Sequence, residues 1–276
     1  MSAPALAVHR WGQGPALLLV HGLGASGRYW DRLGEAASGW GGVAPDLLGF
    51  GRSPKPPTSS YSVDEHLDAL APLLEGPTLV VGHSTGAILA AALAAREPEA
   101  VTGLVLLGVP AFPDEATARA QIGRLGLLAR LTVERRPAGR LVCEAMCLLR
   151  PLALALGPLV IRDLPPAIVA DGVRHTWTSY SRTLANVVVA HRTLPDLVGA
   201  RLPTAVVQGR DDAVAPRGYT EALVAAARDQ GAPVELRLVE GDHHLAVRNP
   251  ALVAGVLARL DARDSAAGGD QGVPDG

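Results

Sequence analysis

Short apolar runs recur along this chain, and most are separated by a stretch long enough to form a helix. Such runs, bounded by glycine, aspartate or proline, are typical of strands buried on both faces. Parallel neighbours need long crossover connections, so the alternation predicts an α/β fold: a mostly parallel, doubly wound sheet flanked by helices. The predicted strands are Ala16–Val20, Gly42–Ala44, Thr78–Val81, Gly103–Leu107, Thr204–Val207 and Val234–Val239.

The alternation stops between residues 111 and 197. This segment contains helical patterns rich in Leu, Ala and Arg, punctuated by prolines. An insertion after a strand end lies over the carboxyl edge of the sheet, so we expect a helical cap that acts as a lid. The α/β core then comprises residues 1–110 and 198–263. Residues 264–276 lack apolar periodicity and are predicted to form a disordered tail.

Composition excludes several classes of protein. Hydrophobic residues make up 48% of the chain and charged residues 19%, which indicates a globular domain that folds on its own. The net charge of -2 without a basic stripe argues against a nucleic-acid partner. No apolar stretch reaches the roughly 20 residues that span a bilayer, and none resembles a signal peptide, so we expect a cytoplasmic protein with no membrane partner.

Neither a cofactor nor a metal ion is predicted. The two cysteines, Cys143 and Cys147, suit neither a disulfide framework nor a zinc pair, and buried thiols are expected. Asp242-His243-His244 has no further ligand cluster at a suitable spacing. The Ala/Arg/Gly-rich composition suggests a bacterium with a high-GC genome. A homo-oligomer is left open.

The segment Gly82-His83-Ser84-Thr85-Gly86 lies between a predicted strand and an Ala-rich helix. This is the context of the G-x-S-x-G turn, in which glycines leave room for a sharp bend that exposes the serine hydroxyl. Ser84 is therefore the candidate nucleophile, although a serine here could also merely cap the helix. At a helix N-terminus, the backbone N–H of Thr85 becomes the first candidate oxyanion donor.

A second loop follows the strand Ala16–Val20 and reads His21-Gly22-Leu23-Gly24. Its glycines let the backbone approach a ligand, so the N–H of Leu23 is the second candidate oxyanion donor. The alternative is a plain strand-to-helix connection. The P-loop reading is excluded because no Lys-Ser/Thr pair follows.

A serine hydroxyl needs a base and an acid that orients the base. After two later strands come Gly209-Arg210-Asp211-Asp212 and Asp242-His243-His244, which gives the chain order Ser, Asp, His expected for this fold. His243 lies just past the last predicted strand and is preferred over its neighbour His244, since adjacent residues in an extended turn point in opposite directions. Between Asp211 and Asp212, physical reasoning alone leaves both open.

Five motifs follow one another along the chain. They are His21-Gly22-Leu23-Gly24 with Trp30, Pro45-Asp46-Leu47-Leu48-Gly49-Phe50-Gly51-Arg52-Ser53, the turn at Ser84, Gly209-Arg210-Asp211-Asp212 with Pro216, and His243 before Pro250. From about Leu6 to Leu260, this order resembles the α/β-hydrolase superfamily with a helical cap. The resemblance implies Asp212 as the acid and His243 as the base. The sequence departs from that pattern at its start, with room for one strand, about Leu6 to His9, before the first core strand.

The resemblance extends to haloalkane dehalogenases and epoxide hydrolases, but those have an aspartate at the position of Ser84. We therefore predict a serine hydrolase that acts on an ester, lactone or thioester of a hydrophobic small molecule. Arg119, Arg124, Trp177 and Tyr180 are candidate polar residues of its cap pocket. Alternatives on the same triad are cleavage of carbon-carbon bonds, cyclisation or acyl transfer. An alternative of another class is a ligand-binding, receptor-like protein with vestigial activity.

Overall fold

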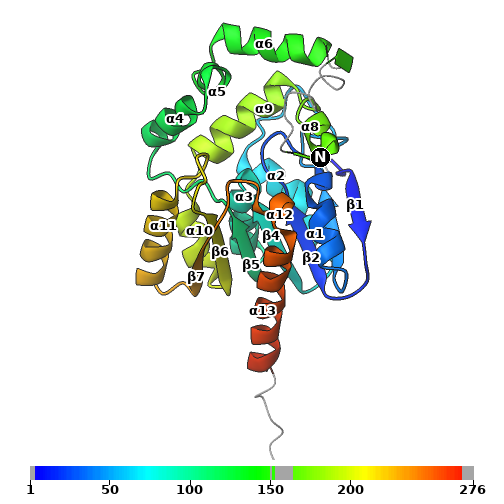
Figure 1. The fold of residues 1–276 in the computed structure, drawn as a ribbon, viewed down its shortest axis with the longest axis vertical. Coiled ribbons are helices and arrows are strands. Elements are labelled where there is room, and N and C mark those ends of the chain that lie inside the picture. The colour runs from blue at the N-terminus through cyan, green and yellow to red at the C-terminus, as the bar shows by residue number, and fades with distance from the viewer. Residues whose placement is uncertain (1–3, 150, 153–163, 269–276) are drawn as a thin grey trace, which may run out of the picture.

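A sheet with the strand order β1-β3-β2-β4-β5-β6-β7 forms the centre of the molecule (Figure 1). The computed structural model describes residues 4–149, 151–152 and 164–268. Strand β1 is antiparallel to β3, and the other neighbouring pairs are parallel, as predicted. The strands are β1 (Val8–Trp11), β2 (Ala16–Val20), β3 (Gly41–Pro45), β4 (Thr78–His83), β5 (Val101–Leu107), β6 (Thr204–Gly209) and β7 (Val234–Val239).

Strands β2 and β7 coincide with the apolar runs that predict them, whereas β3, β4, β5 and β6 extend beyond theirs. Strand β4 continues to His83, because Gly82 and His83 still pair with the end of β5. Strand β1 lies two residues further along the chain than predicted, since its antiparallel register joins Val8 to Pro45 of β3. Strand ends depend on the neighbouring strand, which a single apolar run does not reveal.

Alternate strand residues pack against helices on opposite faces of the sheet. Leu18 and Val20 belong to a cluster that includes every apolar residue of α3 from Ala87 to Ala94, whereas Leu17 and Leu19 belong to a cluster with Leu257 of α13. The helices on the α3 side are α2 (Val63–Leu70), α3 (Thr85–Arg96), α10 (Thr193–Ala200) and α11 (Arg217–Asp229), and those opposite are α1 (Asp31–Ala36), α12 (Leu245–Arg248) and α13 (Pro250–Gly268).

The described part of the segment between β5 and β6 is mostly helical, and much of it lies at one end of the molecule, at the top of Figure 1. Local signals set its helix starts: the Asp114 side chain accepts the Thr117 N–H at the start of α4, and Thr176 forms a capping box with Ser179 at the start of α9. Its described elements are α4 (Glu115–Arg124), α5 (Leu127–Val133), α6 (Pro137–Leu148), α8 (Pro166–Asp171), α9 (Trp177–Thr183) and the π-helical segment η3 (Leu184–Val189).

The division into a core (1–110 and 198–263) and a cap (111–197) stays a proposal. Helix α10 crosses its second boundary, yet it packs against α3 of the core. We therefore propose that the chain has returned to the core by Thr193, before α10 rather than within it.

The tail predicted as disordered, 264–276, begins inside a helix. Helix α13 runs to Gly268, because the alanine-rich sequence at its end favours helix and extends the turns that precede it. Residues 269–276 lie outside the described part of the chain. Within that part, no helix is both long and apolar enough to cross a membrane.

Candidate active site

Ser84 lies in a sharp turn between β4 and α3. Its backbone adopts φ 55° and ψ -122°, a combination that is unfavourable for a residue with a side chain unless the surroundings impose it. The Ser84 N–H donates to the Leu107 carbonyl of β5 at 2.9 Å, and the Ser84 carbonyl accepts the Ala87 N–H at 2.8 Å. The predicted strand-turn-helix arrangement is present, and hydrogen bonds on both sides fix the turn.

Two glycines bring the first loop against this turn. A Cβ on Gly86 would lie 2.1 Å from the Val20 carbonyl oxygen, and a Cβ on Gly22 would lie 3.0 Å from the Ser84 Cβ. Real Cβ atoms do not approach as closely as 2.1 Å and seldom as closely as 3.0 Å, so glycine at position 86 allows β2 to pack on the first turn of α3, and glycine at position 22 relieves a tight contact.

The backbone amides of Leu23 and Thr85, the two predicted oxyanion donors, follow directly after Gly22 and Ser84. In the described part of the chain, neither N–H donates a hydrogen bond. Thr85 also begins α3, where the helix dipole favours negative charge. Both amides are therefore free to donate to an anionic oxygen beside Ser84.

The buried Asp212 pairs with the partly buried His243. The Nδ1 of His243 lies 2.8 Å from Oδ2 of Asp212. The other carboxylate oxygen, Oδ1, accepts the N–H groups of Val214 and Ala215 at 2.9 and 2.8 Å. These donors fix the carboxylate, so it can hold the imidazole with Nε2 free to accept a proton.

Gly108, the residue after β5, lies where these groups meet. A Cβ on it would lie 3.0 Å from both Asp212 Oδ2 and His243 Nδ1. Leu107, directly before it, accepts the Ser84 N–H. The structure thus brings Ser84, Asp212 and His243 from three separate loops to the same edge of the sheet. Asp211, in contrast, is exposed.

His83 is a residue whose importance the sequence did not indicate. Its Nε2 lies 2.8 Å from the His243 carbonyl oxygen, and its ring stacks on Tyr29 with centroids 4.5 Å apart. Burial lowers the pKa of His83 well below 6.5, so the ring is neutral at pH 7 and Nε2–H donates. His83 therefore positions the loop that carries His243. His83 occupies the first x position of the G-x-S-x-G turn, which can hold different residue types, so no local signal reveals this role.

His21 and Asp46, two polar residues at strand ends, hold the first loop in place. His21 Nε2 accepts the Leu47 N–H at 2.9 Å, and its Nδ1 donates to the Gly22 carbonyl at 2.7 Å. Burial lowers the pKa of His21, in agreement with this neutral form. Asp46 accepts the Gly27 N–H at 2.7 Å. His21 thus stabilises the start of the first loop, before Leu23, and Asp46 stabilises the part of the loop that follows Leu23.

An ion pair joins the first loop to the cap. Arg28, in the short helix η1 (Gly27–Trp30), donates to both carboxylate oxygens of Asp171 in α8, at 2.7 and 2.9 Å. Ser26 donates to the same carboxylate at 2.5 Å. Burial raises the pKa of Asp171, but these hydrogen bonds outweigh it and hold the pKa below its ordinary value.

A cavity of about 260 Å³ lies within the cap. Its wall reaches the first loop, because Tyr180 Cε2 lies 3.4 Å from where a Cβ on Gly24 would be. His175 packs against Tyr180, and burial raises the pKa of the Cys143 thiol to about 12, so the thiol stays neutral. The lining residues are Leu128, Ala129, Thr132, Cys143, Met146, Cys147, Gly172, Val173, His175, Trp177 and Tyr180. Trp177 and Tyr180 are thus at the cavity, whereas Arg119 and Arg124 do not line it.

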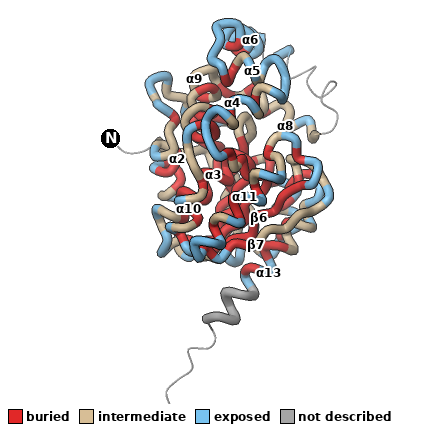
Figure 2. Tube along the Cα trace, turned by 90° about the vertical axis from the view of Figure 1, so that its left-hand side faces the viewer, coloured by how far each residue is buried: buried red, intermediate tan, exposed pale blue. Residues whose placement is uncertain are grey.

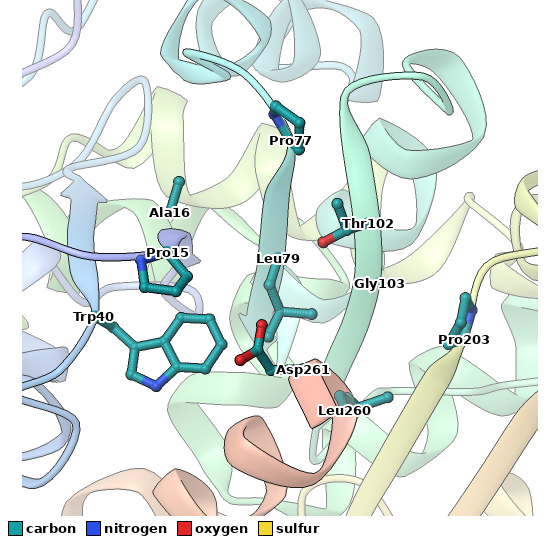
Figure 3. A pocket seen from close by; sticks show the side chains of 10 residues that line it. All are labelled: Pro15, Ala16, Trp40, Pro77, Leu79, Thr102, Gly103, Pro203, Leu260 and Asp261. Atoms are coloured by element: carbon teal, nitrogen blue, oxygen red, sulfur yellow. The ribbon is translucent and has the colours of Figure 1, made fainter. Parts of the chain in front are cut away.

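A second cavity, of about 220 Å³, lies at the opposite edge of the sheet, where strands β2, β4, β5 and β6 begin (Figure 3). Trp40, Leu79 and Leu260 surround it together with Asp261. Ser84 follows the far end of β4. This cavity is therefore remote from the Asp212–His243 pair. Among the residues that the structure describes, no group of His, Cys, Asp and Glu side chains could hold a metal ion.

Comparison with known sequences gives a consistent result. A family model described as the alpha/beta hydrolase fold matches residues 15–247. The lipase LipV of Mycobacterium tuberculosis is 45% identical over 120 residues, which cover 41% of this chain and 45% of that protein. The probable lysophospholipase BODYGUARD 5 of Arabidopsis thaliana is 28% identical over 84% of this chain and 58% of its own length. The chain thus spans about half the length of these two relatives.

Solved structures share the fold. A thermophilic esterase from Thermogutta terrifontis superposes with a TM-score of 0.70 at 23% identity, covering 94% of this chain and 93% of that chain. The enol-lactonase from Burkholderia xenovorans LB400 also has a TM-score of 0.70, at 18% identity, covering 93% of this chain and 96% of that one.

Proposed function

Because this chain belongs to the α/β-hydrolase family, we propose that it is a serine hydrolase that cleaves an ester, lactone or thioester of a hydrophobic small molecule. The observation that carries the proposal is the 2.8 Å hydrogen bond between His243 and Asp212, at the edge of the sheet where Ser84 lies. A base oriented in this way is what a serine hydroxyl needs to become a nucleophile.

The proposed reaction has two stages. His243 Nε2 takes the Ser84 proton while Oγ attacks the carbonyl carbon, and the Leu23 and Thr85 amides bind the oxyanion. The imidazolium then gives its proton to the leaving oxygen or sulfur, and the acyl group stays on Ser84. Water, deprotonated by His243, attacks the acyl-enzyme, and the proton returns to Ser84 as the carboxylic acid leaves. Asp212 remains ionised throughout and stabilises the imidazolium.

The activities named for similar proteins support the ester class. They include a lipase, a probable lysophospholipase and an esterase, all of which point to esters. The cap cavity supports a hydrophobic substrate, because its walls contain leucine, valine, methionine and aromatic side chains. A cavity of this kind beside the first loop suits the apolar part of an ester whose carbonyl lies at Ser84.

The test combines covalent labelling with turnover. We expect a fluorophosphonate probe to label the purified protein, and p-nitrophenyl esters to be hydrolysed with a preference for acyl chains longer than acetate. Labelling should disappear in Ser84→Ala and fall strongly in His243→Ala and Asp212→Asn.

Each variant has a matched control in the chain. Ser60→Ala removes an exposed serine, His244→Ala the neighbouring histidine, and Asp211→Asn the neighbouring exposed aspartate. These should label like the wild type. A folded wild-type protein that is not labelled would favour the receptor-like alternative and overturn the proposed mechanism.

A further inference from the structure

Helices α5 and α6 carry an unusual concentration of exposed apolar side chains. Within the described residues, every exposed large hydrophobic side chain lies between residues 125 and 152, and Leu148 is 83% exposed. Figure 1 places α6 at the end of the molecule furthest from α13, and Figure 2 shows much of this region as exposed. We refer to this set as the outer cap surface: Leu125, Leu127, Leu128, Leu141, Val142, Met146, Leu148, Leu149 and Leu152.

Helix α6 has two apolar faces. One contains Gly139 and Cys143, which are buried against the rest of the cap. The other contains Leu141, Val142 and Leu148, and Leu149 follows directly after the helix; all four are exposed. Leu141 and Leu148 are seven residues apart and so lie on the same side of the helix. A helix that is apolar on its outer side favours contact with an apolar partner there, because exposing apolar surface to water is unfavourable.

The same region is basic. Between residues 115 and 149, from the start of α4, the sequence has six arginines and three glutamates, whereas the whole chain has a net charge of -2. Each glutamate is paired: Glu115 with Arg119, Glu134 with Arg130 and Arg136, and Glu144 with Arg140. Positive charge therefore remains in excess around the outer cap surface, while the remainder of the molecule is acidic.

We propose that the outer cap surface docks on an anionic phospholipid membrane. The apolar side chains would enter the boundary between headgroups and acyl chains, and the arginines would face the negative headgroups, as in interfacial amphipathic helices. This is attachment to a surface and not a span, in keeping with the lack of a spanning helix among the described residues. It revises the expectation of no membrane partner, which rested on the lack of spanning segments.

The docking geometry also orients the cap cavity. Cys143 and Cys147 of α6 line the cavity, while Leu141 and Leu148 lie on the outer side of the same helix. At α6, one helix about 10 Å in diameter therefore separates the cavity from Leu141 and Leu148, whereas Leu128 and Met146 belong both to the cavity lining and to the outer cap surface. The docking itself does not depend on the proposed chemistry.

The test is sedimentation with vesicles, using the Ser84→Ala protein so that binding is measured without turnover. We expect more protein to sediment with phosphatidylglycerol vesicles than with phosphatidylcholine vesicles, and added salt to weaken the difference. Leu141→Ser/Leu148→Ser/Leu149→Ser should lower binding about tenfold or more, because three leucines no longer enter the lipid. Arg136→Gln/Arg140→Gln should remove several-fold of the preference for phosphatidylglycerol.

Matched controls lie on α11, on the core. Ala222→Ser/Ala225→Ser and Arg217→Gln change exposed positions of similar chemistry and should leave binding unchanged. Thermal melting checks that each variant is folded. Equal binding by the wild type and the leucine variant would overturn the proposal. The proposal would also be overturned if the wild type were a dimer that does not bind vesicles and the leucine variant were a monomer. The partner of the outer cap surface would then be a second copy of the chain.

Discussion

The core and the cap differ in how completely they bury their apolar side chains. Leu17 to Val20 of β2 are fully buried, and α3 is buried on every side. In α6, by contrast, only Gly139 and Cys143 are buried. The core therefore buries its apolar side chains within itself, whereas the outer part of the cap leaves apolar surface available for contacts with another molecule.

This difference separates the chemistry from the choice of substrate. The candidate catalytic groups sit on turns that follow β4, β6 and β7, and strands of one hydrogen-bonded sheet can hold atoms within a few tenths of an ångström. The cavity that would hold the substrate is lined by cap residues, which can be substituted more freely than residues of the core. Contacts between the regions include Arg28 with Asp171 and His66 with Thr183. We call the Arg28–Asp171 contact between the core and the cap the joint. The following variants test whether the core, the joint and the cap each affect a different property of the protein.

The largest expected effect is on the chemistry in the core. Ser84→Ala should lower kcat on a p-nitrophenyl ester by about 10⁴-fold or more, because no acyl-enzyme can form. Because the side chain loses a single oxygen, the melting temperature should stay close to that of the wild type. Stopped assays and a thermal melt measure both; retained turnover with unchanged stability would remove Ser84 from the mechanism.

The next effect compares glycines in the two regions. Gly86→Ala should destabilise the protein by several kcal/mol or prevent folding, since the new Cβ would lie 2.1 Å from the Val20 carbonyl. Gly123→Ala in α4 meets nothing closer than 3.8 Å and should stabilise by about 0.5 to 1 kcal/mol through helix propensity. Chemical denaturation measures the two; similar losses would mean that the cap is packed as tightly as the core.

At the joint, Asp171→Asn should cost about 2 kcal/mol of stability, because Arg28 would lose its charged partner in a partly buried site. The first loop would also lose a connection to α8, so we expect kcat to fall more than KM changes. Arg10→Gln, which breaks the exposed pair with Glu75, is the control and should change neither. A loss of stability with unaltered kcat would show that the pair is structural alone.

Within the cap, Ala129→Phe should fill part of the cavity and lower kcat/KM for long-chain esters about tenfold, with little effect on acetate esters. Ala145→Phe adds the same ring to the exposed side of α6 and serves as the control. A uniform loss across chain lengths would contradict a role of this cavity in substrate choice.

The smallest expected effect concerns pH. Burial lowers the pKa of His66 to about 4 from 6.5, so the unfolded chain binds a proton at pH values where the folded protein does not. With respect to His66, the folded protein therefore has its full stability above pH 6.5. It loses part of this stability as the pH falls towards 4, because protonation favours the unfolded chain. Between pH 6.5 and 5.5, the free energy of unfolding should fall by about 1 kcal/mol less in His66→Gln than in the wild type. Denaturation at the two pH values tests this; parallel slopes would mean that His66 is protonated in the fold.

The sequence by itself determined the α/β fold, because apolar runs and the helices between them are local signals that tertiary structure has no reason to override. The sharp turn at Ser84 was readable for the same reason: Gly82 is needed by the turn itself, because a Cβ on it would lie 2.3 Å from the Gly86 carbonyl oxygen, whereas Gly86 is needed by the packing of β2 on α3. The chain order of Ser84, Asp212 and His243 named the candidate groups. Their roles remain a proposal.

Only the tertiary structure decided the features that join distant parts of the chain. The bond from His83 to the His243 carbonyl and the ion pair between Arg28 and Asp171 connect residues more than a hundred positions apart. The cap cavity and the outer cap surface likewise depend on which side of α6 meets the rest of the cap. An apolar pattern predicts that a face is buried but not against what, so α6, apolar on two sides, left its exposed side undetermined until the helices were packed.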